Sequence, residues 1–124
     1  MESRNEKSVQ ATLLAGHTPL VILHGSLDEK YAETLLNALR EAAPFKSSFV
    51  LVDFGSITQV TPSGLRLLLP YLSNLQAQKK ELVLYNMRKD IQATVSSSGF
   101  DSLVTIKPTL QNALQYVQQP DKQT

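Results

Sequence analysis

The sequence has no cysteine and only two histidines among its 124 residues. The absence of cysteine excludes disulfide bonds, thiolate metal sites and a cysteine nucleophile. His17 and His24 fall in an expected turn and at an expected strand end, with no acidic partner and no metal-ligand spacing beside them. Gly55 and Gly64 match neither of the common glycine-rich phosphate loops. The sequence therefore predicts no enzyme, no metal site and no cofactor.

Charge of one sign is also lacking, because 12 Lys and Arg residues face 11 Asp and Glu residues, for a net charge of +1. The basic residues are dispersed, whereas a nucleic-acid binder gathers them into a stripe. Long apolar runs are missing too, since Arg66 interrupts the longest one and a membrane-spanning helix needs about 20 apolar residues. The first residues, MESRNEKS, do not form a secretory signal. We expect a cytoplasmic protein with no nucleic-acid partner and no membrane insertion.

The chain does contain enough apolar residues, 42% of the total, to form one packed domain. We place this domain at residues 9–118, between flexible tails at residues 1–8 and 119–124. Strands are expected at residues 9–14, 20–24, 49–54, 81–85 and 103–106, and helices after Asp28, after Thr61, from Arg88 and from Leu110. This alternation predicts an α/β fold with a mostly parallel sheet, joined by right-handed crossovers, and an antiparallel first strand at one edge.

Residues 49–69, FVLVDFGSITQVTPSGLRLLL, are the most informative segment, because an apolar strand there leads through a polar turn into an amphipathic helix. We call the turn, residues 61–64, the elbow. Thr61 is a favoured N-cap, and Pro62 fits the first helical position, where its missing N–H costs nothing. Hydroxyls and free backbone N–H groups at such a helix start suit a phosphate or a partner's side chain. A helix cap alone explains the same residues, since every helix end needs its polar groups satisfied.

The helix after the elbow carries an apolar stripe that we expect to pack against the sheet. Its members are Leu65, Leu68, Leu69, Leu72 and Leu75, widened by Leu67 and Tyr71. Inside a continuous helix Pro70 would lose its backbone bond to the Arg66 carbonyl, so we predict a kink at residues 66–70.

The later helices carry end signals of the same kind. Gly99 is expected to end one helix, with Phe100 packing back on it, and Ser96 to Ser98 are expected to form its fraying last turn. Thr109 is expected to cap the last helix. The apolar face of that helix is predicted from Leu110, Ala113, Leu114 and Val117.

Two carboxylates stand at expected element ends. Asp28 is a natural N-cap for the first helix. Asp53 lies near the C-terminal end of the apolar strand, where open α/β sheets place ligand sites, so it can face a polar surface beside the elbow. Bonds to backbone N–H groups of the following residues explain Asp53 equally well.

The order and spacing of five segments resemble the STAS domain of anti-sigma factor antagonists. The segments are VILHGSLD, FVLVDFGSITQVTPSGLRLLL, ELVLYNM, SSSGFDSLVTI and TLQNAL. The resemblance covers residues 9–118. It implies a STAS (SpoIIAA-like) sandwich with a mostly parallel sheet of four or five strands, an antiparallel edge strand and about four helices.

In that family the elbow reads Asp-Ser-Ser-Gly or Asp-Ser-Thr-Gly, and a kinase that is also the anti-sigma factor phosphorylates the hydroxyl after the Asp. By this resemblance Thr61 takes the Asp position, Pro62 the acceptor position and Ser63 the next hydroxyl position. Proline has no hydroxyl, so the usual switch cannot operate at Pro62. Ser63, and after it Thr61, are the remaining acceptor candidates.

The resemblance thus implies a protein-interaction module that binds an anti-sigma factor or a serine-kinase-like ATPase, without the usual phospho-switch. The candidate partner-binding residues are Asp28, Asp53, Thr61, Pro62, Ser63, Gly64 and Arg66. An alternative is an accessory subunit docked on an ABC-type transporter ATPase, as STAS-like proteins of phospholipid transporters are; those relatives need no phospho-switch. A small-molecule sensor would require a pocket that the sequence does not reveal.

Overall fold

The computed structural model describes residues 9–14, 18–42 and 48–118. Its strands are β1 (Val9–Leu14), β2 (Thr18–Leu27), β3 (Phe49–Val60), β4 (Glu81–Tyr85) and β5 (Thr105–Lys107). Its helices are α1 (Glu29–Ala42), α2 (Pro62–Arg66), α3 (Leu69–Ala77), α4 (Lys89–Ser97) and α5 (Leu110–Gln118), with a short 3₁₀ turn η2 (Phe100–Ser102). The expected tails and the turn that contains His17 lie outside the described residues.

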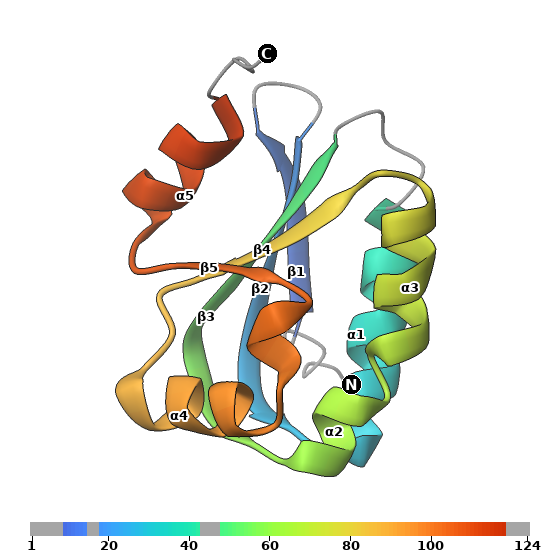
Figure 1. The fold of residues 1–124 in the computed structure, drawn as a ribbon, viewed down its shortest axis with the longest axis vertical. Helices are drawn as coiled ribbons and strands as arrows, with labels where there is room; N and C mark the ends of the chain where they lie inside the picture. Colours follow the sequence, from blue (N-terminus) through green and yellow to red (C-terminus); the bar gives the residue numbers. More distant parts are fainter. Residues whose placement is uncertain (1–8, 15–17, 43–47, 119–124) are drawn as a thin grey trace, which may run out of the picture.

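The five strands form one sheet in the order β1-β2-β3-β4-β5. β1 pairs antiparallel with β2, and every other neighbouring pair is parallel. This arrangement confirms the predicted α/β fold, including the antiparallel edge strand. Figure 1 shows α1 and α3 on one side of the sheet and α5 on the other.

Each face of the sheet has its own core, because alternate residues of β3 point to opposite faces. Val50, Val52 and Phe54 pack in the main core with side chains from α1, α2, α3 and α4. Leu51 packs in a smaller core under α5, which also contains Leu20, Val83, Tyr85 and Ala113. The nearly continuous apolar run of β3 therefore reflects a strand that is buried on both faces.

β2 and β3 run further than the sequence indicated, to Leu27 and Val60. The pairing between them continues through polar residues, with register shifts at Ile22/His24 and at Gly25/Ser26. The two strands end level with each other, with Leu27 opposite Val60. As a result, the helices that follow them begin side by side.

The predicted kink after the elbow is confirmed, and it is a complete break between α2 and α3. The Leu68 N–H bonds to the Leu65 carbonyl at 2.9 Å, a tighter turn than an α-helix makes. The break rotates α3 relative to α2, and Figure 1 shows the two helices at an angle.

This rotation divides the predicted apolar stripe. Its buried members are Leu65, Leu68, Tyr71, Leu72 and Leu75. The prediction is wrong for Leu69 and Leu67, whose exposed fractions are 36% and 44%. A stripe drawn on one straight helix cannot follow the change of direction at residues 67–68.

Replacing Pro70 with alanine tests this break. Within a continuous helix a proline costs about 3 kcal/mol, so its removal would stabilise the chain by that amount. Pro70 instead lies in the first turn of α3, where its missing N–H has no helical partner to lose. We expect urea denaturation of the Pro70→Ala variant to show a change in unfolding free energy of less than about 1 kcal/mol. A gain near 3 kcal/mol would contradict the break.

The later helix ends also follow the predicted chemistry. Gly99 has a φ of 82°, which places it in the left-handed region that favours glycine. Phe100 after it is only 3% exposed, in the main core, as predicted. Thr109 caps α5, since its Oγ1 accepts the Asn112 N–H at 3.1 Å.

Two predictions about this part of the chain are wrong. Leu110 is 37% exposed, so the buried face of α5 centres on Ala113. The last strand begins at Thr105, two residues later than expected, because η2 occupies residues 100–102. Leu103 between them is 37% exposed.

Candidate functional site

The starts of α1 and α2 lie together at one end of the sheet, the lower end in Figure 1. The Thr61 N–H donates to the Leu27 carbonyl at 3.0 Å, which joins the end of β3 to the end of β2. Asp28 follows Leu27 directly. The sequence-predicted residues Asp28 and Thr61 to Gly64 are therefore neighbours, although more than thirty positions separate Asp28 from the elbow.

The elbow has the predicted cap. Thr61 is extended, with φ −109° and ψ 150°, and its Oγ1 accepts the Gly64 N–H at 3.0 Å. Pro62 occupies the first turn of α2, and the Ser63 Oγ lies 3.5 Å from the Thr61 Oγ1. The two hydroxyls therefore form one small polar group at the helix start.

Exposure differs sharply among the elbow residues. Pro62 and Arg66 are exposed, Thr61 and Ser63 are half-buried, and Gly64 is buried. An approaching protein therefore meets the proline ring, the two hydroxyls and the guanidinium. Gly64 is not part of that surface, although the sequence placed it among the partner-binding residues.

Gly64 instead permits a close approach between α2 and the start of α1. A Cβ at this position would lie 2.6 Å from the Leu27 carbonyl oxygen and 2.9 Å from the Asp28 Cα. Such distances are shorter than any ordinary contact between these atoms. The absence of a side chain at Gly64 therefore sets the position of the elbow against the β2–α1 junction.

Asp28 caps α1 as predicted, since its Oδ1 accepts the Tyr31 N–H at 3.0 Å. Its side chain is half-buried. Because Thr61 bonds to the residue before it, Asp28 borders the elbow and adds a carboxylate to that edge.

Asp53 does not join the elbow. Its Oδ1 accepts the Gly55 N–H at 2.7 Å. This is the bond to a following backbone N–H that the sequence offered as one explanation of Asp53. It also accepts a hydrogen bond from the Tyr85 hydroxyl, and burial, with this carboxylate's charge, raises the pKa of Tyr85. Asp53 alternates with Val52 and Phe54, so it faces the α5 side of the sheet. Seven strand residues, 54–60, separate it from Thr61, a rise of about 25 Å along the strand.

A hollow that no sequence pattern predicted lies beside the elbow. This hollow, of about 380 Å³, lies between the α2–α3 segment and the end of α4. Its lining residues are Pro62, Leu65, Arg66, Leu69, Ser97, Ser98, Gly99, Phe100 and Leu103. The break between α2 and α3 turns Leu69 toward it; Pro70 predicts a break at residues 66–70 but not the direction in which Leu69 then points.

The groups at the elbow are suited to binding another molecule. Within residues 9–14, 18–42 and 48–118, no three His, Asp or Glu side chains come together as metal ligands. None of the helices in these ranges combines the length and apolar character needed to cross a bilayer. At the elbow, a capped helix start presents hydroxyls, a proline ring and a guanidinium beside an apolar hollow.

Comparison with known proteins identifies a family and a shared fold. A protein-family model described as "Mlab, STAS domain" matches residues 11–105. The unphosphorylated anti-sigma factor antagonist SpoIIAA has a similar structure, with a TM-score of 0.71 and 20% identity over 88% of this chain and 95% of SpoIIAA.

Two further solved structures are similar. One is a putative anti-sigma factor antagonist from Thermotoga maritima, with a TM-score of 0.74 and 13% identity over 90% of this chain and 95% of that one. The other is a variant of RsbS from Moorella thermoacetica, with a TM-score of 0.70 and 16% identity over 88% and 93%. No curated protein matches the sequence. At these identities the structural likenesses establish a shared fold.

Proposed function

This chain belongs to the STAS-domain family, and from that premise we propose that it is a non-enzymatic module that binds an ATP-binding protein through the elbow. The observation that carries the proposal is the exposure of Pro62 and Arg66 around the half-buried hydroxyls of Thr61 and Ser63. Asp28 borders the same surface. A rigid, capped helix start presents these groups in a fixed geometry, which lowers the entropy lost on binding.

The leading candidate for the partner is an anti-sigma factor or a related serine-kinase-like ATPase. The solved structures named above, which share the fold, include proteins described as anti-sigma factor antagonists. Binding would sequester the ATPase and regulate what it controls. Partners of this kind are cytoplasmic, which puts the proposed role in the cytoplasm.

We propose further that the binding is not switched at the family's usual acceptor position, because Pro62 has no hydroxyl. The Thr61 hydroxyl oxygen is engaged as the cap of α2, so a phosphate there would disturb the helix start. Ser63 is the better acceptor candidate, since its hydroxyl caps nothing. A phosphate on it would add a charge of about −1.5 to −2 to the surface.

Affinity purification of the chain from its own cells, with mass-spectrometric identification of what copurifies, tests the class of partner. The purified ATP-binding partner is then incubated with the chain and ATP, and the intact mass is measured. We expect a stable complex and no added phosphate. A stoichiometric phosphate on the parent chain that is absent from the Ser63→Ala variant would contradict the unswitched form.

A second candidate is an accessory subunit of an ABC-type transporter ATPase, such as a phospholipid transporter. Pro62 favours it, because such a subunit needs no acceptor hydroxyl. The matching family model is described by the name Mlab and not as an anti-sigma factor antagonist, so the family assignment leaves this candidate open. Recovery of a transport ATPase in the same purification would make the transporter subunit the leading candidate. Recovery of a histidine-kinase-like ATPase would exclude the transporter subunit.

A further inference from the structure

The hollow beside the elbow is mainly apolar and open to solvent. Its walls come from two separate segments, the α2–α3 break and the end of α4 with η2. Leu69 and Leu103 line it from these two segments and are 36% and 37% exposed. Among the residues whose burial the structure describes, four large apolar side chains reach such exposure, and the other two are Leu67 and Leu110. Two of the four therefore lie on a single concave surface, which is a mark of an interaction site.

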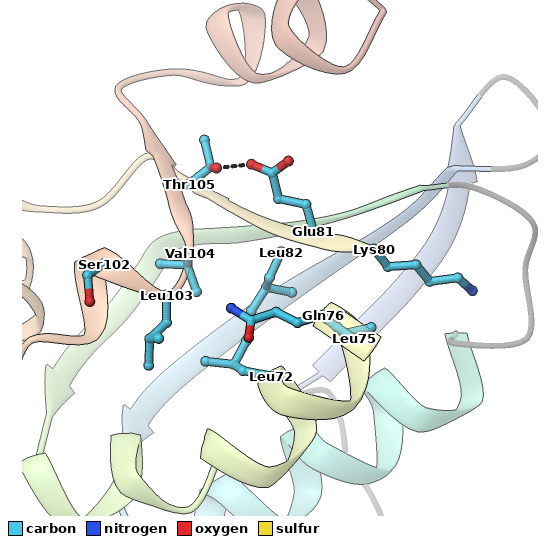
Figure 2. A pocket seen from close by; sticks show the side chains of 10 residues that line it. All are labelled: Leu72, Leu75, Gln76, Lys80, Glu81, Leu82, Ser102, Leu103, Val104 and Thr105. Carbon is cyan, nitrogen blue, oxygen red and sulfur yellow. Dashed lines mark hydrogen bonds between the residues drawn. The ribbon is translucent and has the colours of Figure 1, made fainter. Parts of the chain in front are cut away.

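A second hollow, of about 240 Å³, continues from the first, and Leu103 lines both. In Figure 2, Leu72 and Gln76 of α3 lie on one side of this second hollow, and Leu103 and Val104 lie on the other. We call the two hollows together the trough. It follows α2 and then α3 as far as Gln76; along α3 alone, from Leu69 to Gln76, it is roughly 10 Å at 1.5 Å per helical residue.

The trough carries its charge unevenly. Arg66 lines the elbow end, is exposed, and forms no ion pair with any residue in the described ranges. No carboxylate lines that hollow. The far end carries both signs, Lys80 and Glu81, and the Glu81 carboxylate accepts hydrogen bonds from the Thr105 and Tyr116 hydroxyls. The elbow end is thus complementary to a negative group.

The polar rim of the elbow end is already hydrogen-bonded internally. The Ser97 Oγ donates to the Thr94 carbonyl at 3.1 Å, and the Ser98 Oγ donates to the Val95 carbonyl at 2.8 Å. These two hydroxyl donors therefore need no hydrogen-bond partner from a ligand. Arg66 remains the polar contact at this end that a ligand must satisfy.

We propose that the trough binds an amphipathic α-helix of the partner, with its apolar side chains between Leu69 and Leu103 and a carboxylate against Arg66. A groove between two helical walls receives the ridge of a third helix, and roughly 10 Å along α3 corresponds to about two helical turns. This inference rests on the proposed function, because it specifies how the partner is held next to the elbow.

The test uses two synthetic helical peptides of about 16 residues, which is about four turns. Both carry leucines on one face; one has glutamates flanking that face, and the other has lysines in their place. Each is titrated into the isotope-labelled full chain and followed by NMR. We expect amide shifts at Arg66, Leu69 and Leu103, and at least tenfold tighter binding of the glutamate peptide.

Charge reversal at Arg66 provides the decisive comparison. Arg66→Glu is expected to reverse the preference between the two peptides. Lys89→Glu, which changes an exposed cation at the start of α4 away from the trough, should leave the preference unchanged. Equal binding of both peptides, no binding, or shifts confined to other surfaces would overturn the proposal.

The outcomes separate this inference from the proposed function. If the chain retains its ATP-binding partner but shows no peptide selectivity, the trough proposal alone fails. If the peptides bind as expected but no ATP-binding protein associates with the chain, the proposed function alone fails.

Discussion

Replacing Gly64 with alanine is expected to lower the free energy of unfolding by about 2–3 kcal/mol, which is in the range of overpacked sites. The added methyl group would lie 2.6 Å from the Leu27 carbonyl oxygen and 2.9 Å from the Asp28 Cα. Both are backbone atoms and cannot rotate away as a side chain would. The elbow must therefore move off the β2–α1 junction, which strains the bond from the Thr61 N–H to the Leu27 carbonyl.

Urea denaturation followed by circular dichroism measures this effect. Ser63→Ala is the matched control, because it changes the preceding residue of the same helical turn without meeting backbone; we expect a change within about 0.5 kcal/mol. The Gly64→Ala variant should also bind the ATP-binding partner more weakly than its remaining folded fraction explains. If alanine at position 64 were neutral, the close approach would not be what positions the elbow.

At alkaline pH the chain is expected to lose roughly 2–3 kcal/mol of stability through one buried phenol, that of Tyr71. Burial raises the pKa of Tyr71 from 10.0 to about 12, and the positive charge of Arg40 offsets part of this rise. The side chain is 5% exposed. A raised folded-state pKa means that this contribution is complete below the unfolded pKa of about 10 and is lost as the pH rises toward about 12.

Tyr71→Phe isolates this contribution, because it keeps the buried ring and removes the ionisable hydroxyl. Unfolding free energies of both proteins are measured from about pH 8 to about pH 12. We expect the stability of the parent relative to Tyr71→Phe to be constant up to about pH 10 and then to fall by roughly 2–3 kcal/mol. Other tyrosines and lysines titrate in both proteins and cancel in the comparison. A difference that does not vary with pH would show that the phenol is not desolvated as described.

The sequence predicted those parts of the fold that depend on local chemistry. Capping side chains at Asp28, Thr61 and Thr109 bond as expected, because each needs only a backbone N–H three residues further along. Pro70 gave the position of the break, since its missing donor is a property of a single residue. The continuous apolar run of β3 identified a strand that is covered on both faces.

Features that depend on three-dimensional arrangement could not be predicted in the same way. The full length of β2 and β3 depends on pairing between strands, which no single segment encodes. The orientation of Asp53, away from the elbow, follows from the alternation of β3 once its start is fixed. The trough exists because the break turns Leu69 outward and η2 leaves Leu103 exposed, and both depend on tertiary packing.

The most direct test of the account is the affinity of the purified ATP-binding partner for a chain altered at the exposed corner of the elbow. Pro62→Arg places a long charged side chain there, and Gln92→Arg places the same side chain on an exposed position of α4. Calorimetric titration should show binding at least about 100-fold weaker, near 2.7 kcal/mol, for Pro62→Arg and unchanged binding for Gln92→Arg. Equal, undiminished affinity of both variants would contradict the proposal that the elbow is the surface through which this protein acts.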